Sequence, residues 1–431
     1  MTATDNRFAT RVATAVWPEL QPRLLRLSET AEDYAAYAQS GGYQNLSDPD
    51  ALLEEIDRSG LLGRGGAAFP LAVKLRTVRE AGRAGSSTVV LANGEEGEPA
   101  SVKDRWLLRY RPHLVLDGVR LAARIVGADR AHVYVSDPHA AHELNTALEA
   151  APSGAAQITV VSVDPGYVAG EETAAVRAVN GGPAKPTDKP PRPFERGVAG
   201  LPTLVSNVET LANLPFILRH GSDAYRAEGT SASSGTFLAT VTGGGRPPTL
   251  YELPHGTPFA ELLEHHQVSA DAVKGVLMGG YFAGLLNREV MDATLDHETM
   301  RRLNSGLGCG AIAVITDDCP VAVAASVMAY FDRENAGQCG SCFNGTAAMS
   351  AVTDALRQGR ATEDDMARLE RWSVVLRGRG ACATLDAATN VATSLLRAFP
   401  AHVARHLADD CDACRANMYH ALRPYEVEAV S

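Results

Sequence analysis

Short β-rich segments alternate with helical segments in the first half of this chain, and this alternation limits the possible fold more than any other feature. Segments 87–93, 131–135 and 157–163 have the composition of strands, whereas segments 106–127 and 139–150 have helical periodicity. Strands that alternate with helices are typical of a largely parallel sheet covered by helices. We therefore predict an α/β domain over residues 1–234, with a helical segment at its N-terminus.

The rest of the chain divides into two further predicted domains. Segments 235–242 and 275–280 have the composition of strands, and a short helix is predicted between them at 258–266. This order predicts a small β-grasp-like α+β domain over residues 235–320. Residues 321–431 are rich in alanine and in helical periodicity, which predicts a C-terminal helical bundle.

The charge and hydropathy of the chain exclude several classes of function. The 431 residues include 40 basic and 51 acidic side chains, which gives a formal net charge of −11. Such an acidic protein is not expected to bind nucleic acid or an anionic membrane surface. No apolar run reaches the ~18 residues of a membrane span, and residues 1–5 do not begin a signal peptide. We expect a cytoplasmic protein with no direct membrane insertion and no nucleic-acid partner.

A glycine-rich segment lies between two predicted helices. Gly63, Arg64 and Gly65 begin this segment, Phe69 lies near its end, and Lys74 follows in the next helix. Glycines let backbone N–H groups approach a phosphate, and a helix N-terminus adds a favourable dipole. The segment matches neither a dinucleotide-binding fingerprint nor a Walker loop, so a plain turn between helices is an equal alternative.

Two acidic turns follow predicted strands. Asn93, Glu95 and Glu96 lie in the first turn, and Glu171 and Glu172 lie in the second. Carboxylates at the carboxyl ends of parallel strands suit hydrogen bonds to sugar hydroxyls or ring N–H groups. A solvated acidic loop explains the first turn equally well, and a helix start explains the second.

Three cysteines in the C-terminal third are spaced as metal ligands. Cys339 and Cys342 form a C-x-x-C pair at the start of a predicted helix, and Cys382 follows further along the chain. Clustered thiols in a long intracellular chain are typical of metal or catalytic sites. This set is one ligand short of the four thiolates that an iron–sulfur cluster normally takes.

Taken together, these segments resemble one family, the NADH-oxidising flavoprotein subunit of respiratory complex I, whose fold also occurs in NAD-linked hydrogenases and formate dehydrogenases. The resemblance covers about residues 50–410 and rests on the order and spacing of the glycine-rich segment, the two acidic turns, Lys189-Pro190-Pro191 and the segment that begins at Asn207. It implies a flavin-binding α/β domain, a soluble-ligand-binding (β-grasp) domain and a helical iron–sulfur domain.

The resemblance also implies FMN and an iron–sulfur cluster as cofactors, and NADH as substrate. The residues that it implies for FMN are Gly63, Arg64, Gly65, Lys74, Asn93, Glu95, Gly170, Glu171 and Asn207. Those that it implies near NADH are Phe69, Glu96, Glu172 and Arg192. Arg192 stands where the family has an aromatic residue stacked on adenine. Because arginine can either stack on adenine or pair with a 2′-phosphate, NADPH is kept as an alternative substrate.

The cysteine motif departs from the family pattern at Ala336, where the family has a cysteine. Four outcomes stay open. In the first, the three thiols hold a 3Fe–4S cluster, and in the second, a 4Fe–4S cluster takes a non-cysteine ligand such as Asn335. In the third, the tail pair Cys411 and Cys414 folds back to supply the fourth ligand. In the fourth, the site is empty.

The remaining cysteines have simpler interpretations. Cys411 and Cys414 are predicted at an exposed helix end, either as incidental thiols or, with His402 or His406, as an incomplete zinc ligand set. Cys309 and Cys319 lie in or beside apolar runs, which predicts small buried hydrophobic side chains.

We predict an enzyme that oxidises NADH by hydride transfer to FMN and passes single electrons through the cluster to a separate acceptor, a ferredoxin or other iron–sulfur protein. No side chain is predicted to react directly, because a flavin itself links two-electron and one-electron chemistry. Two alternatives remain. One is an NADH-oxidising subunit of a multisubunit hydrogenase, formate dehydrogenase or complex I-like assembly. The other is a non-catalytic paralogue that serves as a structural or nucleotide-binding scaffold.

Overall fold

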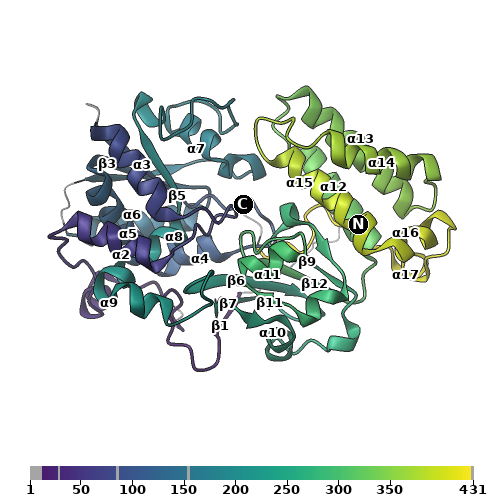
Figure 1. The fold of residues 1–431 in the computed structure, drawn as a ribbon, viewed down its shortest axis with the longest axis horizontal. Helices are drawn as coiled ribbons and strands as arrows, with labels where there is room; N and C mark the ends of the chain where they lie inside the picture. The colour runs from purple at the N-terminus through teal and green to yellow at the C-terminus, as the bar shows by residue number, and fades with distance from the viewer. Residues whose placement is uncertain (1–11, 28–29, 84–86, 153–155, 429–431) are drawn as a thin grey trace, which may run out of the picture.

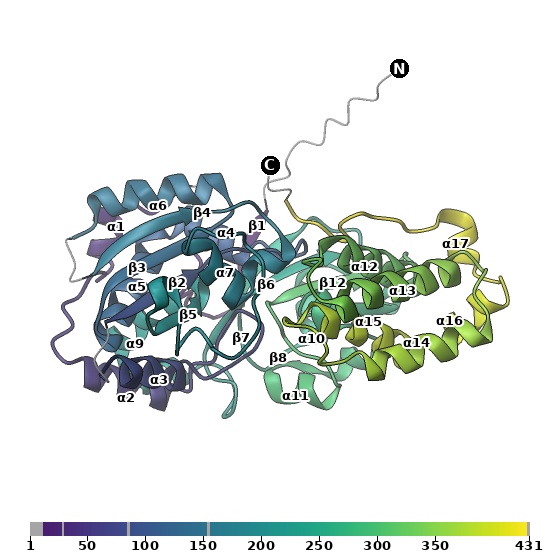
Figure 2. The ribbon, with the colours of Figure 1, turned by 90° about the horizontal axis from the view of Figure 1, so that it is seen from above.

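The structure, a computed structural model, describes residues 12–27, 30–83, 87–152 and 156–428. Within these residues the chain forms a four-stranded parallel sheet with helices, a six-stranded mixed sheet, and a group of C-terminal helices (Figure 1). Figure 2 shows the four-stranded sheet and the C-terminal helices at opposite sides of the molecule. Among the described residues, no helix has both the length and the apolar character of a membrane span.

The four-stranded sheet has the spatial order β4-β3-β2-β5, and all its pairings are parallel. Its strands are β2 (Thr88–Asn93), β3 (Ala128–Val135), β4 (Gln157–Ser162) and β5 (Thr203–Asn207). The chain runs outward from β2 to β4 and then returns, so that β5 pairs with the free side of β2. This reversal is a topological switch point, where open parallel sheets bind ligands outside the carboxyl ends of the strands.

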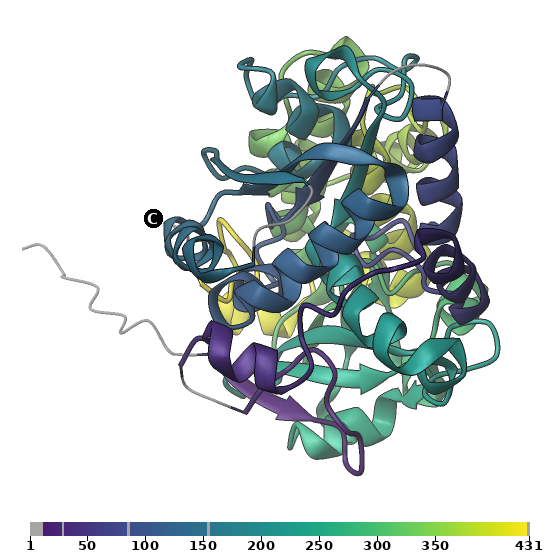
Figure 3. The same ribbon diagram turned by 90° about the vertical axis from the view of Figure 1, so that its left-hand side faces the viewer.

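Helices pack against this sheet on both faces (Figure 3). The helices of this α/β region are α2 (Pro49–Ser59), α3 (Leu71–Arg83), α4 (Lys103–Tyr110), α5 (Pro112–Val126), α6 (Pro138–Ala150), α7 (Glu172–Val179), α8 (Val208–Ala212) and α9 (Leu214–Arg226). Of these, α3, α5, α6, α7 and α8 contact the strands directly. The single helix expected over residues 106–127 is two helices, because Pro112 has no N–H group and begins a new helix at its first position. Helix α5 is apolar on most sides and forms the centre of this core.

The six-stranded sheet has the order β1-β7-β6-β12-β9-β10. Strands β6 (Thr236–Gly243) and β7 (Thr249–Pro254) form an antiparallel hairpin, and β12 (Ala311–Ile315) pairs parallel with β6. The short strands β9 (Gly275–Met278) and β10 (Leu285–Leu286) complete one edge, and α10 (Phe259–His265) connects the hairpin to β9.

The other edge of this sheet is β1 (Ala13–Val16), which pairs parallel with β7. The prediction of a helical N-terminal segment is therefore wrong for these residues, and α1 (Tyr34–Gln39) is the first helix of the described chain. The buried Glu252 on β7 explains part of this arrangement. Its carboxylate accepts hydrogen bonds from the backbone N–H groups of Arg23, Leu24 and Leu25 at 2.9–3.2 Å, which fixes the chain that follows β1.

The C-terminal third is helical and has its own hydrophobic core. Its helices are α12 (Pro320–Glu334), α13 (Gly340–Arg357), α14 (Glu363–Val375), α15 (Thr384–Ala398), α16 (Pro400–Leu407) and α17 (Asp412–Asn417). After α17 the chain runs back to the α/β region, where the Val427 N–H donates to the Pro99 carbonyl oxygen at 3.1 Å. The guanidinium of Arg109 on α4 pairs with Glu428 at 2.7 Å.

Candidate functional site

A cavity of about 470 Å³ opens at the switch point, beside the carboxyl ends of β2 and β5. Asn93 ends β2, Asn207 ends β5, and the two are register partners. Phe282, from a short turn after β9, and Cys382, from the turn before α15, also line the cavity. All three parts of the fold therefore contribute to one site.

Most of the predicted site residues meet in this cavity. Those that line it are Gly63, Gly65, Phe69, Lys74, Asn93, Glu95, Glu96, Gly170, Glu171, Glu172, Asn207 and Cys382. Those that do not line it are Arg64, Arg192, Cys339 and Cys342.

The glycine-rich turn approaches the cavity through its backbone. Gly66 has a φ of +111°, which side chains disfavour, and a Cβ atom on Gly65 would lie only 3.1 Å from Cβ of Asn207. The backbone N–H of Arg64 donates to Thr210 Oγ1 at 2.8 Å and holds the turn against α8. Bare backbone in such a turn leaves room for a phosphate or a flat ring system.

Arg64 does not contribute its charge to the cavity. Its guanidinium is buried and points to the other side, where it donates to the Tyr225 hydroxyl at 3.1 Å and to the Thr236 carbonyl oxygen at 3.0 Å. The side chain therefore joins the glycine-rich turn to α9 and β6 and lies behind the binding surface.

The two asparagines at the switch point organise the loops around them. Asn93 Nδ2 donates to the Gly170 carbonyl oxygen at 2.8 Å, so the first acidic turn is tied to the second. Asn207 Nδ2 donates to Asp104 Oδ2 at 2.7 Å, and its Oδ1 accepts from the Glu209 N–H at 3.0 Å at the start of α8.

Glu95 lines the cavity, and one of its carboxylate oxygens is buried without a hydrogen-bond partner in the described chain. Burial raises the pKa of its carboxyl to about 8. Oε1 accepts a long hydrogen bond of 3.4 Å from the Gly166 N–H, while Oε2 has no hydrogen-bond partner within the described chain. A buried polar atom without a partner is costly, so a ring N–H or hydroxyl of a bound molecule would complete the site. A Cβ atom on Gly170 would lie 2.6 Å from this Oε2 and would close the space.

The neighbouring Glu96 has a different role, because its oxygens are already occupied. They accept hydrogen bonds from Ser101 Oγ at 2.6 Å and from the N–H groups of Asp104 and Arg105 at 3.2 and 3.1 Å. A carboxylate at the N-terminus of α4 is favoured by the helix dipole. Glu96 therefore stabilises α4 while it forms part of the cavity wall.

Two lysines provide positive charge at the second acidic turn. Lys74 Nζ donates to the Val205 carbonyl oxygen at 3.1 Å, and burial lowers the pKa of this lysine. Lys189 Nζ pairs with Glu171 at 2.7 Å and with Glu172 at 2.9 Å. Burial lowers the pKa of Lys189, but the hydrogen bonds to these two carboxylates outweigh burial and raise it.

Several residues that line the cavity were not predicted from the sequence, among them Asp104, Tyr167, Phe282 and Cys309. Tyr167 lies between the cavity and the helical region, with its ring centroid 5.8 Å from that of Tyr330 and 5.3 Å from that of Phe331. Its position just before the second acidic turn is a local signal that could have identified it. Phe282 and Cys309 come from the six-stranded sheet region and carry no local signal for this site.

The three predicted metal ligands converge beside this cavity. Cys339 and Cys342 lie at the start of α13, and the Ala381 N–H is 3.5 Å from Cys339 Sγ. Burial, followed by the nearby thiols of Cys382 and Cys339, raises the pKa of Cys342 to about 12. Cys382 also lines the cavity, so this set of three cysteines lies next to the switch point of the parallel sheet. Three convergent thiols fit an iron–sulfur cluster that takes three protein ligands.

The two residues at the position of the missing cysteine are already engaged in other contacts. Ala336 has no ligand atom in its side chain, and its carbonyl oxygen accepts a hydrogen bond from Lys185 Nζ at 3.0 Å. The Asn335 side chain donates to the Asp332 carbonyl oxygen at 2.6 Å and accepts from the Gly337 N–H at 3.0 Å. Asn335 therefore caps the C-terminus of α12.

The tail cysteines correct two predictions. Cys411 and Cys414 are buried and do not lie at an exposed helix end. Their sulfur atoms pack with Cys319 and His406, and His406 contacts Leu356 near the C-terminus of α13. Cys342 lies at the opposite end of this 18-residue helix, about 20 Å away. The tail pair therefore does not supply the fourth ligand of the cluster at Cys339, Cys342 and Cys382.

Known proteins are similar to this chain over most of its length. Residues 56–216 match the family described as the Nuo51 FMN-binding domain, and residues 322–406 match the NADH-ubiquinone oxidoreductase-F iron–sulfur binding region. One of the NADH-quinone oxidoreductase subunits of Rhizobium meliloti (strain 1021) is 32% identical over 416 residues, which cover 90% of this chain and 98% of that protein. The chain belongs to this family of flavoprotein subunits. The predicted family, the FMN-binding domain and the iron–sulfur binding region are thereby confirmed.

Hydrogenase subunits are also similar to this chain. The NADP-reducing hydrogenase subunit HndC of Solidesulfovibrio fructosivorans is 29% identical over 423 residues, which cover 93% of this chain and 85% of that protein. A crystal structure of an NAD+-reducing NiFe hydrogenase in the H2-reduced state matches with a TM-score of 0.77 and 32% identity over 84% of this chain. The match spans 63% of that hydrogenase chain, less than two thirds of its length. The fold is a mixed α/β structure with parallel strands, as in this relative.

Proposed function

We propose that this chain oxidises NADH with FMN bound in the cavity at the carboxyl ends of β2 and β5, and passes single electrons to a separate acceptor protein. The observation that carries this proposal is the composition of the cavity wall. One wall is the glycine-rich turn, which lies within the residues that match the FMN-binding family. Another wall contains Cys382, one of the three cysteines of the predicted cluster. A cofactor in this cavity is therefore next to a metal-ligating thiol, so electron transfer needs only a short path.

The cavity residues divide by their chemistry toward FMN. The backbone of Gly63 and Gly65, with the ammonium of Lys74, suits the phosphate. Glu95 offers its free oxygen to a ring N–H or ribityl hydroxyl, and Asn93 and Asn207 hold the loops that surround the ring. When bound, FMN supplies the exchange between the two electrons of a hydride and the single-electron steps of an iron–sulfur centre.

We assign the dinucleotide to the open side of the cavity. Phe69 is 46% exposed at the edge of the glycine-rich turn, where its ring offers a stacking surface. Glu172 lines the same side, and Arg192 is exposed outside the cavity. Since the Arg192 backbone N–H is held by Glu195 at 2.7 Å while its guanidinium is exposed, we keep NADPH as a second candidate substrate.

We further propose three domains over residues 1–234, 235–320 and 321–431, the second with a β-grasp-like fold. Separate hydrophobic cores in the α/β region, the six-stranded sheet and the C-terminal helices support this division. The hairpin β6–β7, the connecting helix α10 and the parallel return strand β12 support the β-grasp description. Strand β1 crosses the first boundary, because it pairs with β7.

The acceptor is the least constrained part of the proposal. A ferredoxin is our first choice, since a small iron–sulfur protein accepts single electrons. The similar proteins are named as subunits of an NADH-quinone oxidoreductase and of a hydrogenase, so the second candidate is an NADH-oxidising subunit of such an assembly. We place the protein in the cytoplasm, because all seven of its cysteines lie in the described part and none forms a disulfide.

The direct test is anaerobic mixing of the purified full-length protein, loaded with FMN and reconstituted with iron and sulfide, with NADH and a ferredoxin. The proposal predicts a yellow protein whose flavin absorbance is bleached by NADH and recovers when ferredoxin is added. Parallel reactions with NADPH measure coenzyme preference. Protein that binds no FMN, or FMN-loaded protein that NADH does not bleach, would contradict the proposal.

A further inference from the structure

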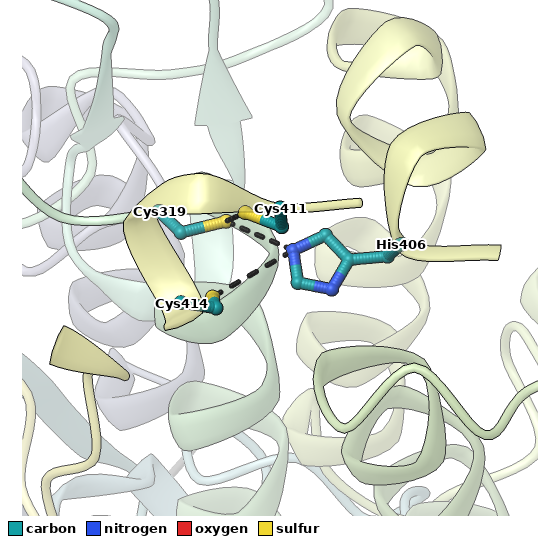
Figure 4. Close-up of side chains that lie close together, drawn as sticks. All are labelled: Cys319, His406, Cys411 and Cys414. Carbon is teal, nitrogen blue, oxygen red and sulfur yellow. Dashed lines mark hydrogen bonds between the residues drawn. The ribbon is translucent and has the colours of Figure 1, made fainter. Parts of the chain in front are cut away.

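We propose that Cys319, His406, Cys411 and Cys414 form a second metal site, which binds one zinc ion and fixes the C-terminal tail (Figure 4). All four side chains are buried, and their ligand atoms lie within 4.8 Å of one another. Three cysteines and one histidine are a common ligand set of closed structural zinc sites. The four come from three separate parts of the chain, and Figure 4 shows them pointing toward a common centre.

The spacing of the ligand atoms fits one tetrahedral ion. Cys319 Sγ is 3.8 Å from Cys411 Sγ and 3.2 Å from His406 Nε2, and Cys414 Sγ is 3.7 Å from the same nitrogen. Zinc–sulfur bonds of about 2.3 Å and zinc–nitrogen bonds of about 2.0–2.1 Å place tetrahedral ligands about 3.5–3.8 Å apart. The observed spacing therefore needs only small adjustments to accept the ion.

The orientation of His406 supports the same conclusion. Its Nδ1 lies 3.1 Å from the Leu356 carbonyl oxygen and donates a hydrogen bond to it. This bond places the proton on Nδ1 and leaves the Nε2 lone pair directed at the three sulfur atoms. Zinc-binding histidines commonly donate their second ring nitrogen to a carbonyl or carboxylate in this way.

An iron–sulfur cluster does not fit these four ligands. Each thiolate of a 4Fe–4S cluster binds a different iron at a corner of the cube, so its sulfur atoms lie farther apart than ligands that share one ion. The compact spacing here corresponds to a single metal. The site is also separated from Cys342 by most of the length of α13, about 20 Å.

The position of the site indicates what the ion does. Cys319 immediately precedes α12, His406 lies in the last turn of α16, and Cys411 and Cys414 lie at the start of α17. One ion would join these three helices where α17, only six residues long, has little stability of its own.

From α17 the tail returns across the molecule. Tyr425 Oη donates to Asp318 Oδ2 at 3.1 Å, next to Cys319, and Arg105 on α4 donates to the Glu428 carbonyl oxygen at 2.9 Å. Arg105 follows the first acidic turn and also donates its backbone N–H to Glu96. The zinc ion therefore fixes one end of a segment whose other end packs beside the cavity. Because zinc has no accessible redox change, its role is structural.

The test is metal analysis of the full-length holoprotein with a matched pair of histidine variants. His406→Ala removes a ligand, whereas His402→Ala changes a half-buried histidine on the same helix that is not part of the site. We expect about one zinc per chain in the wild type and in H402A, and a loss of at least about tenfold in H406A. Iron content is expected to be equal in all three. Wild-type protein without zinc, or H406A with full zinc, would overturn the proposal.

A second measurement keeps the test valid if H406A does not fold. Zinc is extracted from folded wild-type protein by a chelator and replaced by cobalt, while circular dichroism reports the helix content. The proposal predicts the absorption of tetrahedral cobalt with thiolate ligands, and zinc-edge X-ray absorption with about three sulfur and one nitrogen neighbours. Octahedral cobalt spectra, or a zinc shell of oxygen atoms only, would show an adventitious ion and overturn the proposal.

Discussion

The two ends of α13 carry cysteine groups that differ in almost every respect. At the N-terminal end, Cys339, Cys342 and Cys382 lie beside the cavity, and Ala336 stands where the family resemblance implies a fourth thiol. At the C-terminal end, the four ligands of the proposed zinc site are complete, buried and about 20 Å from the first group.

This difference separates electron transfer from structural support within one helical region. The set of three cysteines next to the cavity suits a cluster that exchanges electrons. The complete, buried set of four ligands suits an ion that only stabilises the fold. Changes at the N-terminal end should therefore alter redox behaviour, and changes at the C-terminal end should alter the order of the tail.

The largest effect is expected from Cys382→Ser. Loss of this ligand leaves two thiols, too few to hold the cluster, so iron content and the NADH-dependent reduction of a ferredoxin should fall by at least about 100-fold. Zinc content should not change, because the zinc ligands lie at the other end of α13. Cys309→Ser, which alters a cavity thiol outside this group, should retain the iron. Equal loss of iron and zinc in C382S would contradict the separation of the two sites.

Lys74→Met tests whether the Lys74 ammonium group contributes to FMN binding in the cavity. The substitution keeps the length of the side chain but removes the ammonium group, so FMN should bind about tenfold more weakly or worse. Fluorescence titration of flavin-free protein measures this directly. Lys274→Met serves as the control, since Lys274 donates to the Asp317 carbonyl oxygen outside the cavity. If both variants bind FMN like the wild type, Lys74 does not contact the phosphate.

Ala336→Cys would add the missing fourth cysteine to the set near the N-terminal end of α13. We expect iron to rise from about three to about four atoms per chain, and the oxidised-state EPR signal of a 3Fe–4S cluster to disappear. Ala336→Ser is the matched control without a thiolate and should keep the wild-type spectrum. A wild-type protein that already contains four irons per chain would show that another group supplies the missing ligand.

The change expected to matter least for electron transfer concerns the buried carboxyl of Glu95. Burial raises its pKa to about 8, above its value in the unfolded chain. Ionisation of this group therefore favours the unfolded state, and the contribution of Glu95 to stability is lost as pH rises from about 4.5 to about 8. Glu95→Gln removes this dependence.

Urea unfolding of flavin-free protein measures the difference. Over this pH interval the wild type should lose about 4 kcal/mol more of its unfolding free energy than E95Q, at about 1.4 kcal/mol for each pH unit by which burial raises the pKa. Parallel stability curves for the two proteins would show that Glu95 ionises normally, with water in the cavity.

Much of the fold could be predicted from local patterns. The strands β2, β3 and β4 and the C-terminal helices follow from alternation and periodicity, which depend on neighbouring residues. Strand β1 could not be predicted, because its partner β7 lies more than two hundred residues away and the carboxylate of Glu252 holds the chain that follows it. The break between α4 and α5 had a local signal in Pro112, which the helical periodicity obscured.

The site divides in the same way. The loops that line the cavity could be identified by their order and spacing. A motif does not show which way a side chain points, however. Arg64 was therefore expected in the cavity, whereas its side chain lies behind the cavity wall. The tail cysteines were interpreted from their own short segment, where two thiols and a histidine are an incomplete set. The missing ligand, Cys319, is 92 residues from Cys411, and only the fold brings them together.

An anaerobic titration of the reconstituted holoprotein with NADH tests the central claim most directly. FMN takes two electrons and the iron–sulfur cluster takes one, so complete reduction should require about 1.5 NADH per chain, with bleaching of the flavin and a change in the EPR signal of the cluster. An end point at about 1.0 NADH, with the EPR signal of the cluster unchanged, would show that the two centres do not exchange electrons and would contradict the account.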